Sequence, residues 1–366
     1  MKFTIDRETL LKPLQQVIGV VERRQTLPVL GNLLLTAGDK GIQVTATDLE
    51  VEIQAGVESQ VDEGGEITVP ARKLLDICKA LPEGAKVQMS VKDQRVQIRS
   101  GKSRFTLSTL PAGDFPVVEQ VQGETRFSIP QNRLRELIER THFSMAQQDV
   151  RYYLNGLLLE ISSNLLRAVA TDGHRLAMCD MQSDVDLPGR QQVIVPRKGI
   201  QELLRLLEDS DTPVDVEVGT NHIRVSRGDL RFTSKLVDGR FPDYERVLPK
   251  GGDKRVLADR EQLRQALSRT SILSNEKYRG IRLNLDKNIV KIQSHNPEQE
   301  EADEEFEVDY QGGGLEIGFN VNYLLDVLGS VRSDQVELTL SDSNSSCLIR
   351  QPGSDQYRYV VMPMRL

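Results

Sequence analysis

The chain contains nearly the same segment three times, and this repeat constrains the fold more than any other feature. The segment reads Thr-Val-Pro-Ala-Arg-Lys-Leu-Leu from Thr68, Ile-Val-Pro-Arg-Lys-Gly-Ile-Gln from Ile194 and, more weakly, Gly-Phe-Asn-Val-Asn-Tyr-Leu-Leu from Gly318. The Thr47-Asp48 pair likewise returns at Thr171-Asp172. Copies start about 125 residues apart, which is the size of a domain rather than of a solenoid repeat. The sequence therefore predicts three tandem copies of one domain, and a symmetric scaffold or ring rather than an enzyme with one cleft.

The length of 366 residues allows each copy to bury its own hydrophobic core. Turn-rich polar stretches near Gly123 and at Lys250-Gly251-Gly252-Asp253 mark the expected boundaries. The predicted domains are residues 1–123, 124–250 and 251–366.

Hydrophobic periodicity predicts the same element order twice within each copy, namely β-α-β-β-β. In the first copy, a strand at Phe3–Ile5 precedes a helix with Leu10, Leu14 and Val17 on one face. Three short alternating runs follow, and the pattern restarts at residues 67–69. The predicted fold class is α+β, with antiparallel sheets and helices segregated to one face.

Composition narrows the function further. The formal net charge is −7, which argues against simple electrostatic adhesion to nucleic acid. No apolar run approaches the roughly 20 residues of a membrane span, and the N-terminus lacks a signal-peptide apolar region. We therefore expect a soluble cytoplasmic protein without cofactors or bound metal. Cys78, Cys179 and Cys347 are expected to be buried reduced thiols.

The strongest candidate for catalysis is the run Thr171-Asp172-Gly173-His174-Arg175. On a strand, Asp172 and His174 would share a face, so an acid-oriented histidine base is conceivable. No nucleophile lies nearby in sequence, and the first copy has no histidine at the equivalent place. A binding site and a plain turn both remain open for this run.

The C-terminus ends in Met362-Pro363-Met364-Arg365-Leu366. A closing strand is expected through Val361, because Pro363 cannot donate to a strand ladder. The two methionines beyond it favour an adaptable apolar contact surface, which is consistent with a peptide-binding groove.

At this point the sequence resembles the bacterial DNA polymerase III beta subunit, the replicative sliding clamp, over essentially its whole length. The resemblance rests on Leu-Leu-Lys-Pro-Leu-Gln-Gln from Leu10, Ser-Arg-Phe-Thr-Leu-Ser-Thr-Leu-Pro from Ser103, Asp-Val-Arg-Tyr-Tyr-Leu-Asn-Gly from Asp149, Ala-Thr-Asp-Gly-His-Arg-Leu-Ala from Ala170 and Thr-Ser-Lys-Leu-Val-Asp-Gly-Arg-Phe-Pro-Asp-Tyr from Thr233.

The resemblance implies a head-to-tail homodimer that closes a six-domain ring around duplex DNA, with helices lining the hole and no catalysis. It also implies a groove between the second and third domains. This groove would bind short motifs of the polymerase III catalytic subunit, the clamp loader, other polymerases and repair proteins. Asn344 departs from the apolar residue expected at the groove's rim. The implied groove residues are Leu154, Thr171, Gly173, His174, Arg175, Leu176, Pro242, Arg246, Val247, Tyr278, Asn320, Tyr323, Ser346, Val360, Met362, Pro363, Met364 and Arg365.

Charge is distributed unevenly along the chain. Residues 95–104 hold four bases and no acid, whereas residues 298–309 hold eight acids and no base. We expect these runs to meet in the dimer, around an apolar centre. The predicted interface residues are Arg95, Arg99, Lys102, Arg104, Phe105, Leu107, Ile272, Leu273, Glu298, Glu300, Glu301 and Glu304.

Sequence-independent contact with DNA requires only a few basic or polar side chains. Tyr152 and Tyr153 are neighbours, so on a strand they would point to opposite faces, one toward the core and one toward DNA. The predicted DNA contacts are Arg24, Arg72, Gln148, Tyr153, Arg197, Lys198 and Arg205.

The sequence leaves two alternatives to a DNA-encircling clamp. One is an open multidomain hub that binds peptides without any DNA role. The other is a hydrolase using Asp172 and His174. Tandem repeats with basic helices favour the clamp over the hub, and the missing nucleophile or metal cluster disfavours the hydrolase.

Overall fold

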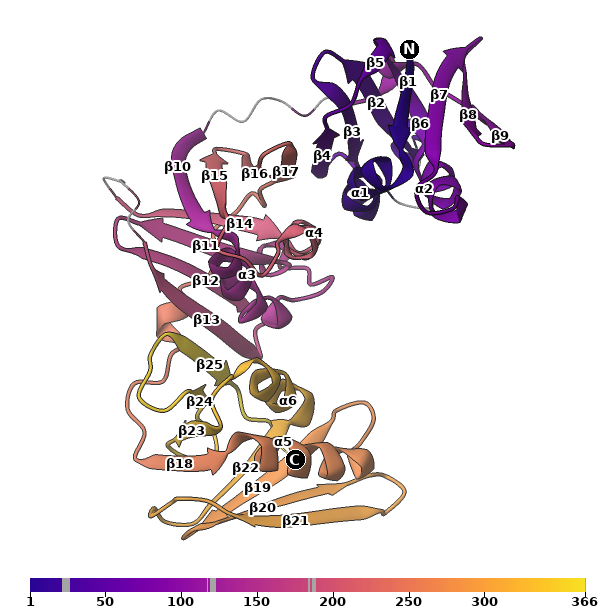
Figure 1. Ribbon diagram of the computed structural model, residues 1–366. Coiled ribbons are helices and arrows are strands. Elements are labelled where there is room, and N and C mark those ends of the chain that lie inside the picture. Colours follow the sequence, from indigo (N-terminus) through magenta and orange to yellow (C-terminus); the bar gives the residue numbers. More distant parts are fainter. Residues whose placement is uncertain (22–26, 117, 119–122, 184, 186–188, 366) are drawn as a thin grey trace. The chain divides into compact units, whose positions relative to one another are not determined.

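The structure is a computed structural model that describes residues 1–21, 27–116, 118, 123–183, 185 and 189–365. The chain forms two compact units, and each is described by itself (Figure 1). Unit 1 holds residues 1–134 and 198–236, and unit 2 holds residues 135–197 and 237–366. Both units therefore take part of their chain from the second sequence copy.

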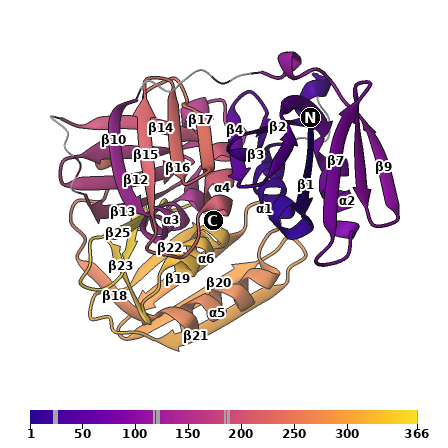
Figure 2. The same cartoon turned by 45° about the horizontal axis from the view of Figure 1, so that its top comes forward.

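The predicted β-α-β-β-β order is confirmed twice in each of the three copies, with one further short strand, β5, in the first. Each helix follows a strand directly, and the two helices of the first and third copies pack as pairs, α1 with α2 and α5 with α6 (Figure 2). The helices are α1 (Arg7–Val17), α2 (Ala71–Ala80), α3 (Gln131–Glu139), α4 (Arg197–Leu206), α5 (Arg260–Thr270) and α6 (Val321–Ser330).

Local sequence explains where these helices begin and what they bury. The side chain of Asp259 caps α5 by accepting a hydrogen bond from the Gln262 amide at 2.8 Å. Asn320 caps α6 in the same way through the Asn322 amide at 2.9 Å. Helix α2 starts immediately after Pro70, and its apolar stripe, Leu74, Leu75 and Cys78, is buried as the periodicity predicts.

Unit 1 contains two antiparallel sheets. The five-stranded sheet has the order β5 (Val61–Glu63), β1 (Lys2–Asp6), β7 (Lys86–Lys92), β8 (Arg95–Ser100) and β9 (Ser103–Ser108). The eight-stranded sheet has the order β10 (Gly123–Pro130), β15 (Pro213–Gly219), β16 (His222–Arg227), β17 (Leu230–Lys235), β4 (Val51–Val57), β3 (Gly41–Thr47), β2 (Asn32–Gly38) and β6 (Gly65–Pro70).

Unit 2 repeats this plan with one eight-stranded and one four-stranded sheet. The larger sheet has the order β14 (Gln191–Pro196), β11 (Gly156–Ser162), β12 (Leu165–Thr171), β13 (Arg175–Gln182), β25 (Tyr357–Val361), β24 (Cys347–Arg350), β23 (Gln335–Leu340) and β18 (Lys254–Asp259). The smaller sheet has the order β21 (Glu301–Glu307), β20 (Ile289–His295), β19 (Gly280–Asp286) and β22 (Leu315–Asn320).

Each eight-stranded sheet joins four strands of one sequence copy to four of the next, through β4 with β17 in unit 1 and β13 with β25 in unit 2. Backbone hydrogen bonds thus run continuously across the predicted boundaries, which is why the compact units do not coincide with the sequence copies. The domain limits after residues 123 and 250 stay predictions.

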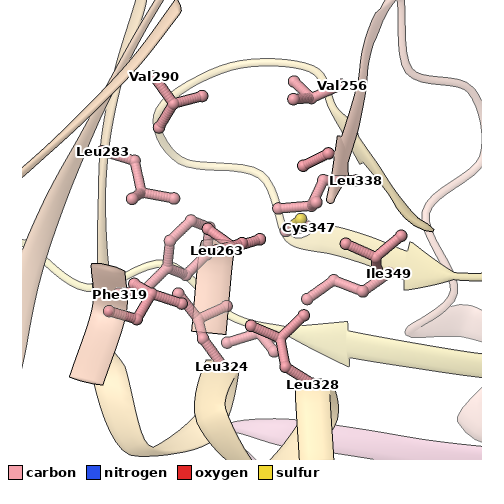
Figure 3. Packing of buried hydrophobic residues seen from close by; sticks show 14 of the residues in the cluster. Val256, Leu263, Leu283, Val290, Phe319, Leu324, Leu328, Leu338, Cys347 and Ile349 are labelled. Carbon is pink, nitrogen blue, oxygen red and sulfur yellow. The ribbon is translucent and has the colours of Figure 1, made fainter. Parts of the chain in front are cut away.

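The core of the third copy lies between its strands and the helices α5 and α6. Leu263 on α5 and Leu324 on α6 point toward Phe319 and Ile349 of the strands (Figure 3). Cys347 lies in the same cluster, and burial raises the pKa of its thiol. All three cysteines are buried and none of them forms a disulfide, as expected. In the described part of the chain, no helix is long and apolar enough to cross a membrane.

Candidate functional site

Residues 172–174 form a tight turn between β12, which ends at Thr171, and β13, which begins at Arg175. One carboxylate oxygen of Asp172 accepts hydrogen bonds from the His174 and Arg175 amides at 2.9 and 3.0 Å. The Thr171 hydroxyl donates to the Arg175 carbonyl at 2.6 Å. Gly173 sits at φ 87°, where its lack of a Cβ avoids strain. Of the alternatives left open for this run, the turn is therefore observed, and Asp172 and His174 do not share a strand face.

This geometry also corrects the hydrolase hypothesis. The second carboxylate oxygen of Asp172 accepts a hydrogen bond from the Arg175 guanidinium at 3.0 Å, so Asp172 holds the turn and Arg175 rather than orienting an imidazole base. His174 is exposed, and its ring stacks on that of Tyr323 at 6.5 Å between centroids. Among the described residues, no group of three His, Cys, Asp or Glu side chains could hold a metal ion.

The C-terminal tail lies against this turn. Strand β25 pairs with β13, so that Leu176 lies opposite Val360 (Figure 1). Beyond the strand, the Met362 amide donates to the His174 carbonyl at 2.9 Å, and the Met364 amide donates to the Gly318 carbonyl of β22 at 2.9 Å. The end of β25 at Val361 confirms the predicted closing strand, and Pro363 falls between the two bonded amides.

An apolar cluster lies under the turn and the tail. It contains Leu176 and Val360, with Val247 packed against it, three of the residues that the resemblance implied for the groove. Leu176 and Val360 are almost fully buried, whereas Val247 is half-buried and available at the surface. Further members, which the sequence did not indicate, come from β11, β12, β13, β14 and β24, from the 3-10 turn at residues 152–154 and from residues 237–248. These are Leu158, Val169, Met178, Ile194, Phe241 and Tyr244, with Tyr153, Val237, Leu248 and Leu348 packed against them.

Strand register could have identified two of the missed members. Met178 lies two residues beyond Leu176 on β13 and so shares its face. Leu348 lies opposite Val360 in the ladder between β24 and β25. The same register links three more, since Val169 lies opposite Met178, and Leu158 lies opposite both Val169 and Ile194. The others come from loops and 3-10 turns, for which sequence periodicity gives no signal.

Arg175 is directed into the protein rather than toward the groove opening. Its guanidinium pairs with Asp172 and Asp326 and donates to the Phe143 carbonyl at 2.8 Å. The same group lies 4.5 Å from the ring centroid of Tyr323. Arg175 thus ties the turn to α6, and burial raises the pKa of the Tyr323 hydroxyl beside it. The guanidinium N–H groups of Arg175 hold the turn in place, and they are already used by protein acceptors rather than available to a peptide backbone.

The remaining predicted groove residues are spread over several segments of unit 2. Pro242 and Arg246 are exposed beside the cluster, and Arg246 pairs with Asp243 at 2.8 Å. Tyr278 and Asn320 lie together at the far end of the tail, where the Asn320 amide donates to the Tyr278 carbonyl at 3.3 Å. Leu154 is buried, Ser346 is half-buried and Asn344 is exposed on a turn. All these residues belong to unit 2, and their assignment to peptide binding stays a prediction.

Several predicted DNA contacts already bind protein groups. Arg205 donates to the carbonyls of Gln15 and Gln16 at the end of α1, at 2.9 and 2.6 Å. Arg72 donates to the Val21 carbonyl at 2.6 Å, Arg197 donates to the Met145 carbonyl at 3.1 Å, and Lys198 pairs with Asp48. These side chains satisfy carbonyls and one carboxylate of the protein itself. Arg24 lies outside the described residues.

The loop that carries Gln148 is well ordered by its own side chains. Arg151 donates two hydrogen bonds to Asp149, which lowers the pKa of that carboxyl to about 2. Tyr152 and Tyr153 lie in a 3-10 turn, not on a strand, with their rings edge to face at 5.8 Å. Tyr152 is 58% exposed, whereas Tyr153 packs against the apolar cluster. The ring that faces solvent is therefore mainly that of Tyr152.

The predicted dimer residues lie at two sheet edges. Phe105 and Leu107 are half-buried on β9, the edge strand of the five-stranded sheet in unit 1. Ile272 is 74% exposed in a 3-10 turn of unit 2, near the edge strand β21. Arg95, Arg99, Lys102 and Arg104 are exposed, as are Glu298, Glu300 and Glu301. Glu304 is already paired with Arg269 in the same chain.

Comparison with known proteins identifies the class. Three consecutive family models match, those of the DNA polymerase III beta subunit N-terminal domain (residues 1–119), central domain (128–243) and C-terminal domain (245–365). The chain belongs to the DNA polymerase III beta subunit family.

Close relatives cover the chain from end to end. The beta sliding clamp of Pseudomonas putida is 62% identical and that of Escherichia coli K12 is 55% identical, each over 100% of both chains. The crystal structure of the DNA polymerase III subunit beta from Pseudomonas aeruginosa matches with a TM-score of 0.98 at 61% identity, again over 100% of both chains. A Pseudomonas aeruginosa sliding clamp bound to griselimycin matches with a TM-score of 0.97.

Proposed function

We propose that this chain is a DNA sliding clamp, a processivity factor that encircles duplex DNA and tethers the replicative polymerase to it. The observation that carries the proposal is the match of all three family domains, in order, over the whole chain. The tethering site is the groove formed by the turn at residues 171–175, the apolar cluster and the C-terminal tail.

Two copies close the ring head to tail, by a heterologous contact between the first domain of one and the third of the other. Strands β9 and β21 support this, because each leaves one edge of its sheet unpaired among the described residues. Exposed arginines lie on β9 (Arg104) and on the neighbouring β8 (Arg95 and Arg99), whereas β21 carries exposed glutamates. Opposite charge fixes the register of such a contact, while Phe105, Leu107, Ile272 and Leu273 supply its apolar centre.

The groove holds partners by a short extended segment. A leucine or phenylalanine side chain inserts beside Val247 and Met362, above the buried Leu176 and Val360. Concave, mostly apolar sites with a few polar groups at the edge bind such segments well. The polymerase catalytic subunit, the clamp loader, other polymerases and repair proteins share this site and therefore compete for it.

The clamp acts by being topologically linked to DNA rather than by catalysing a reaction. A closed ring needs no net positive charge, since it cannot leave DNA without opening, and a net charge of −7 even favours sliding over adhesion. Arg72, Arg197, Lys198, Arg205, Gln148 and the Tyr152–Tyr153 pair supply weak, sequence-independent contacts.

The decisive experiment loads the protein onto nicked circular DNA with a clamp loader and then raises the salt concentration. A topological link survives 1 M salt and is lost when the circle is linearised, whereas phosphate contacts weaken steeply with salt. Retention that falls with salt equally on circular and linear DNA would refute encirclement and favour the open peptide-binding hub.

A further inference from the structure

A row of charged side chains lies on the eight-stranded sheet of unit 2, directly beside the apolar cluster. Glu160 of β11 lies opposite Arg167 of β12, which in turn lies opposite Asp180 of β13. Each residue of this charged row is two positions from a cluster member on its own strand and so shares that member's sheet face. The signs alternate across the strands, and the three side chains are at most 20% exposed. The apolar cluster therefore borders a largely buried row of paired charges.

Ion pairs and hydrogen bonds hold the charged row together. Arg167 donates two hydrogen bonds to Asp180, at 2.6 and 2.7 Å. Arg358 of β25 donates to the same carboxylate at 2.6 Å, and Arg190 pairs with Glu160. Removing one partner of a buried ion pair leaves an uncompensated charge, so the paired side chains are held in one arrangement.

Tyr244 joins the charged row to the apolar cluster. Its ring belongs to the cluster, and the residue is 3% exposed. Its hydroxyl donates to Glu160 at 2.9 Å and accepts from Arg167 and Arg190, each at 3.0 Å. These bonds use both the donor and the acceptor capacity of the hydroxyl. The side chain is therefore fixed at both ends, by apolar packing at the ring and by charged groups at the oxygen.

The backbone connects Tyr244 directly to the groove. The 3-10 turn Tyr244–Arg246 has Tyr244 as its buried residue, and the Tyr244 carbonyl accepts from the Val247 amide at 3.0 Å. Val247 is half-buried and packs against the apolar cluster at the groove. Residues 242, 243, 245 and 246 are exposed, so Tyr244 is the buried anchor of this turn. The position of Val247 thus depends on where the Tyr244 side chain is held.

We propose that Tyr244 is a positioning residue of the groove. Its hydroxyl, held by one acid and two arginines, fixes Val247 where the apolar residue of a partner peptide inserts. This inference rests on the proposed function and adds to it a residue that acts through another, since Tyr244 itself is buried beneath the groove. A wall that already has its bound conformation costs less conformational entropy when the peptide binds, so the anchor raises the affinity for every partner that uses this wall.

The test compares Tyr244→Phe with the unaltered full-length protein, using a synthetic peptide with a Leu-Phe core in an alanine and serine background. The substitution keeps the ring in the cluster and removes only the hydroxyl. Isothermal titration calorimetry should show about fivefold weaker binding, because the peptide must then order the turn. Tyr310→Phe is the matched control and should leave the affinity unchanged. The Tyr310 hydroxyl is also bonded, to the Gly313 carbonyl at 2.6 Å, but it belongs to the core of the third copy.

A double-mutant cycle separates positioning from a general loss of stability. If Tyr244 acts through Val247, Tyr244→Phe should weaken binding by no more than about twofold in a Val247→Ala background, because the positioned side chain is gone. In a Met362→Ala background, the same substitution should keep its full effect, because Met362 lies on the tail and not on this turn.

Arg190→Ala provides a second variant with an intact Tyr244. The Arg190 side chain is 47% exposed, and its removal takes one donor from the hydroxyl while the pair of Arg167 and Asp180 remains. It should weaken peptide binding about twofold to threefold and show the same dependence on Val247. Circular dichroism and native mass spectrometry check the fold and the oligomeric state of each variant.

The outcomes separate the two proposals. If the peptide fails to bind the unaltered protein, or binds Val247→Ala with unchanged affinity, the groove itself is wrong. If Val247→Ala weakens binding but Tyr244→Phe has no more effect than Tyr310→Phe, only the positioning role of Tyr244 is overturned. The same conclusion follows if Tyr244→Phe weakens binding equally in the Val247→Ala and Met362→Ala backgrounds.

Discussion

The chain forms the same turn in both of its units, but the strand side chains that follow the turn are polar in unit 1 and apolar in unit 2. In unit 1, the Asp48 carboxylate accepts hydrogen bonds from the amides of Glu50 and Val51 at 2.9 and 2.7 Å, as Asp172 does in unit 2. Leu49 has φ 79°, close to the 87° of Gly173. Even the next contact repeats, since the Glu50 carbonyl accepts from the Lys235 amide at 2.8 Å, as the His174 carbonyl does from Met362.

The difference lies in the side chains that follow. Leu176 and Val360 face each other in unit 2, whereas the equivalent strand pair in unit 1 brings Glu52 opposite Thr233. The first pair lies in an apolar cluster suited to a leucine or phenylalanine, and the second is polar. Identical backbone geometry therefore yields a candidate binding site only where the strand residues are apolar. We expect unit 1 to have no peptide groove at this turn.

The largest expected effect tests the tail that only unit 2 possesses. Deleting residues 362–366 removes the tail that lies against the turn and Gly318. Binding of a polymerase-derived peptide should therefore weaken at least about 100-fold, because several anchor contacts are lost. Isothermal titration calorimetry measures the affinity for the peptide. Lys235→Ala, at the equivalent position of unit 1, is the control and should leave affinity unchanged. Unchanged binding by the truncated protein would place the groove elsewhere.

The second prediction concerns the two unpaired sheet edges, which are basic at β9 in unit 1 and acidic at β21 in unit 2. Replacing Ile272 and Leu273 by Ala removes the apolar centre of the proposed dimer and should weaken dimerisation roughly 100-fold. Because Ile272 is 74% exposed, the fold should be retained. Analytical ultracentrifugation should show monomers at low concentration, while Leu27→Ala, another exposed apolar residue, should leave the dimer intact. A double variant that stays fully dimeric would contradict the interface.

A third prediction uses Glu160, a buried acid of unit 2. Burial alone would raise the pKa of its carboxyl, but hydrogen bonds from Gln192, Arg190 and Tyr244 outweigh this and lower it. A carboxyl whose pKa is lower in the folded state stabilises the fold at pH values above its unfolded pKa of about 4.3. This stabilisation is lost as the pH falls through the folded pKa. Glu160→Gln should therefore destabilise the protein by about 2 kcal/mol at neutral pH, and less in acid.

Urea unfolding at neutral pH and near pH 4 provides the measurement. Glu245→Gln is the matched control, because Glu245 also approaches Arg190 but is 59% exposed, and it should change stability little. An equal loss for both variants would show that burial of Glu160 has no special role.

The smallest expected effect has the opposite sign and comes from Glu52 in unit 1. Burial raises the pKa of its carboxyl despite a hydrogen bond from Val118 and nearby Arg224 and Arg231. A raised pKa favours the folded state at low pH, and this benefit is lost as the pH rises through the folded value. Glu52→Gln should therefore stabilise the protein by on the order of 1 kcal/mol at neutral pH, with no gain in acid.

The same urea titrations test this, with exposed Glu50→Gln as the control. Destabilisation by Glu52→Gln at neutral pH would mean that the charged carboxylate of Glu52 stabilises the pairing of β4 with β17. Glu52 would then resemble Glu160 of unit 2 rather than differ from it.

Much of this architecture follows from local sequence. The spacing of apolar residues predicted every β-α-β-β-β unit, and the recurring Thr-Asp pair marked a repeated structural element before its turn geometry was known. These features depend on residues a few positions apart, which periodicity and turn chemistry describe well. Residues 172–174 show the limit, because the sequence left both a binding site and a plain turn open there, and one carboxylate with two backbone amides decides for the turn.

Local sequence patterns predicted the three repeats and their elements, and the family resemblance supplied the candidate groove residues, whose role in peptide binding stays a prediction. Only the tertiary structure decided that Arg175 points inward, that Arg205 caps α1 and that Tyr153 packs against the apolar cluster. Only the structure, too, places the Tyr244 hydroxyl over the charged row beside the apolar cluster. The physical reason is that these contacts join segments tens to hundreds of residues apart, and strand pairing between copies sets their register rather than any local pattern.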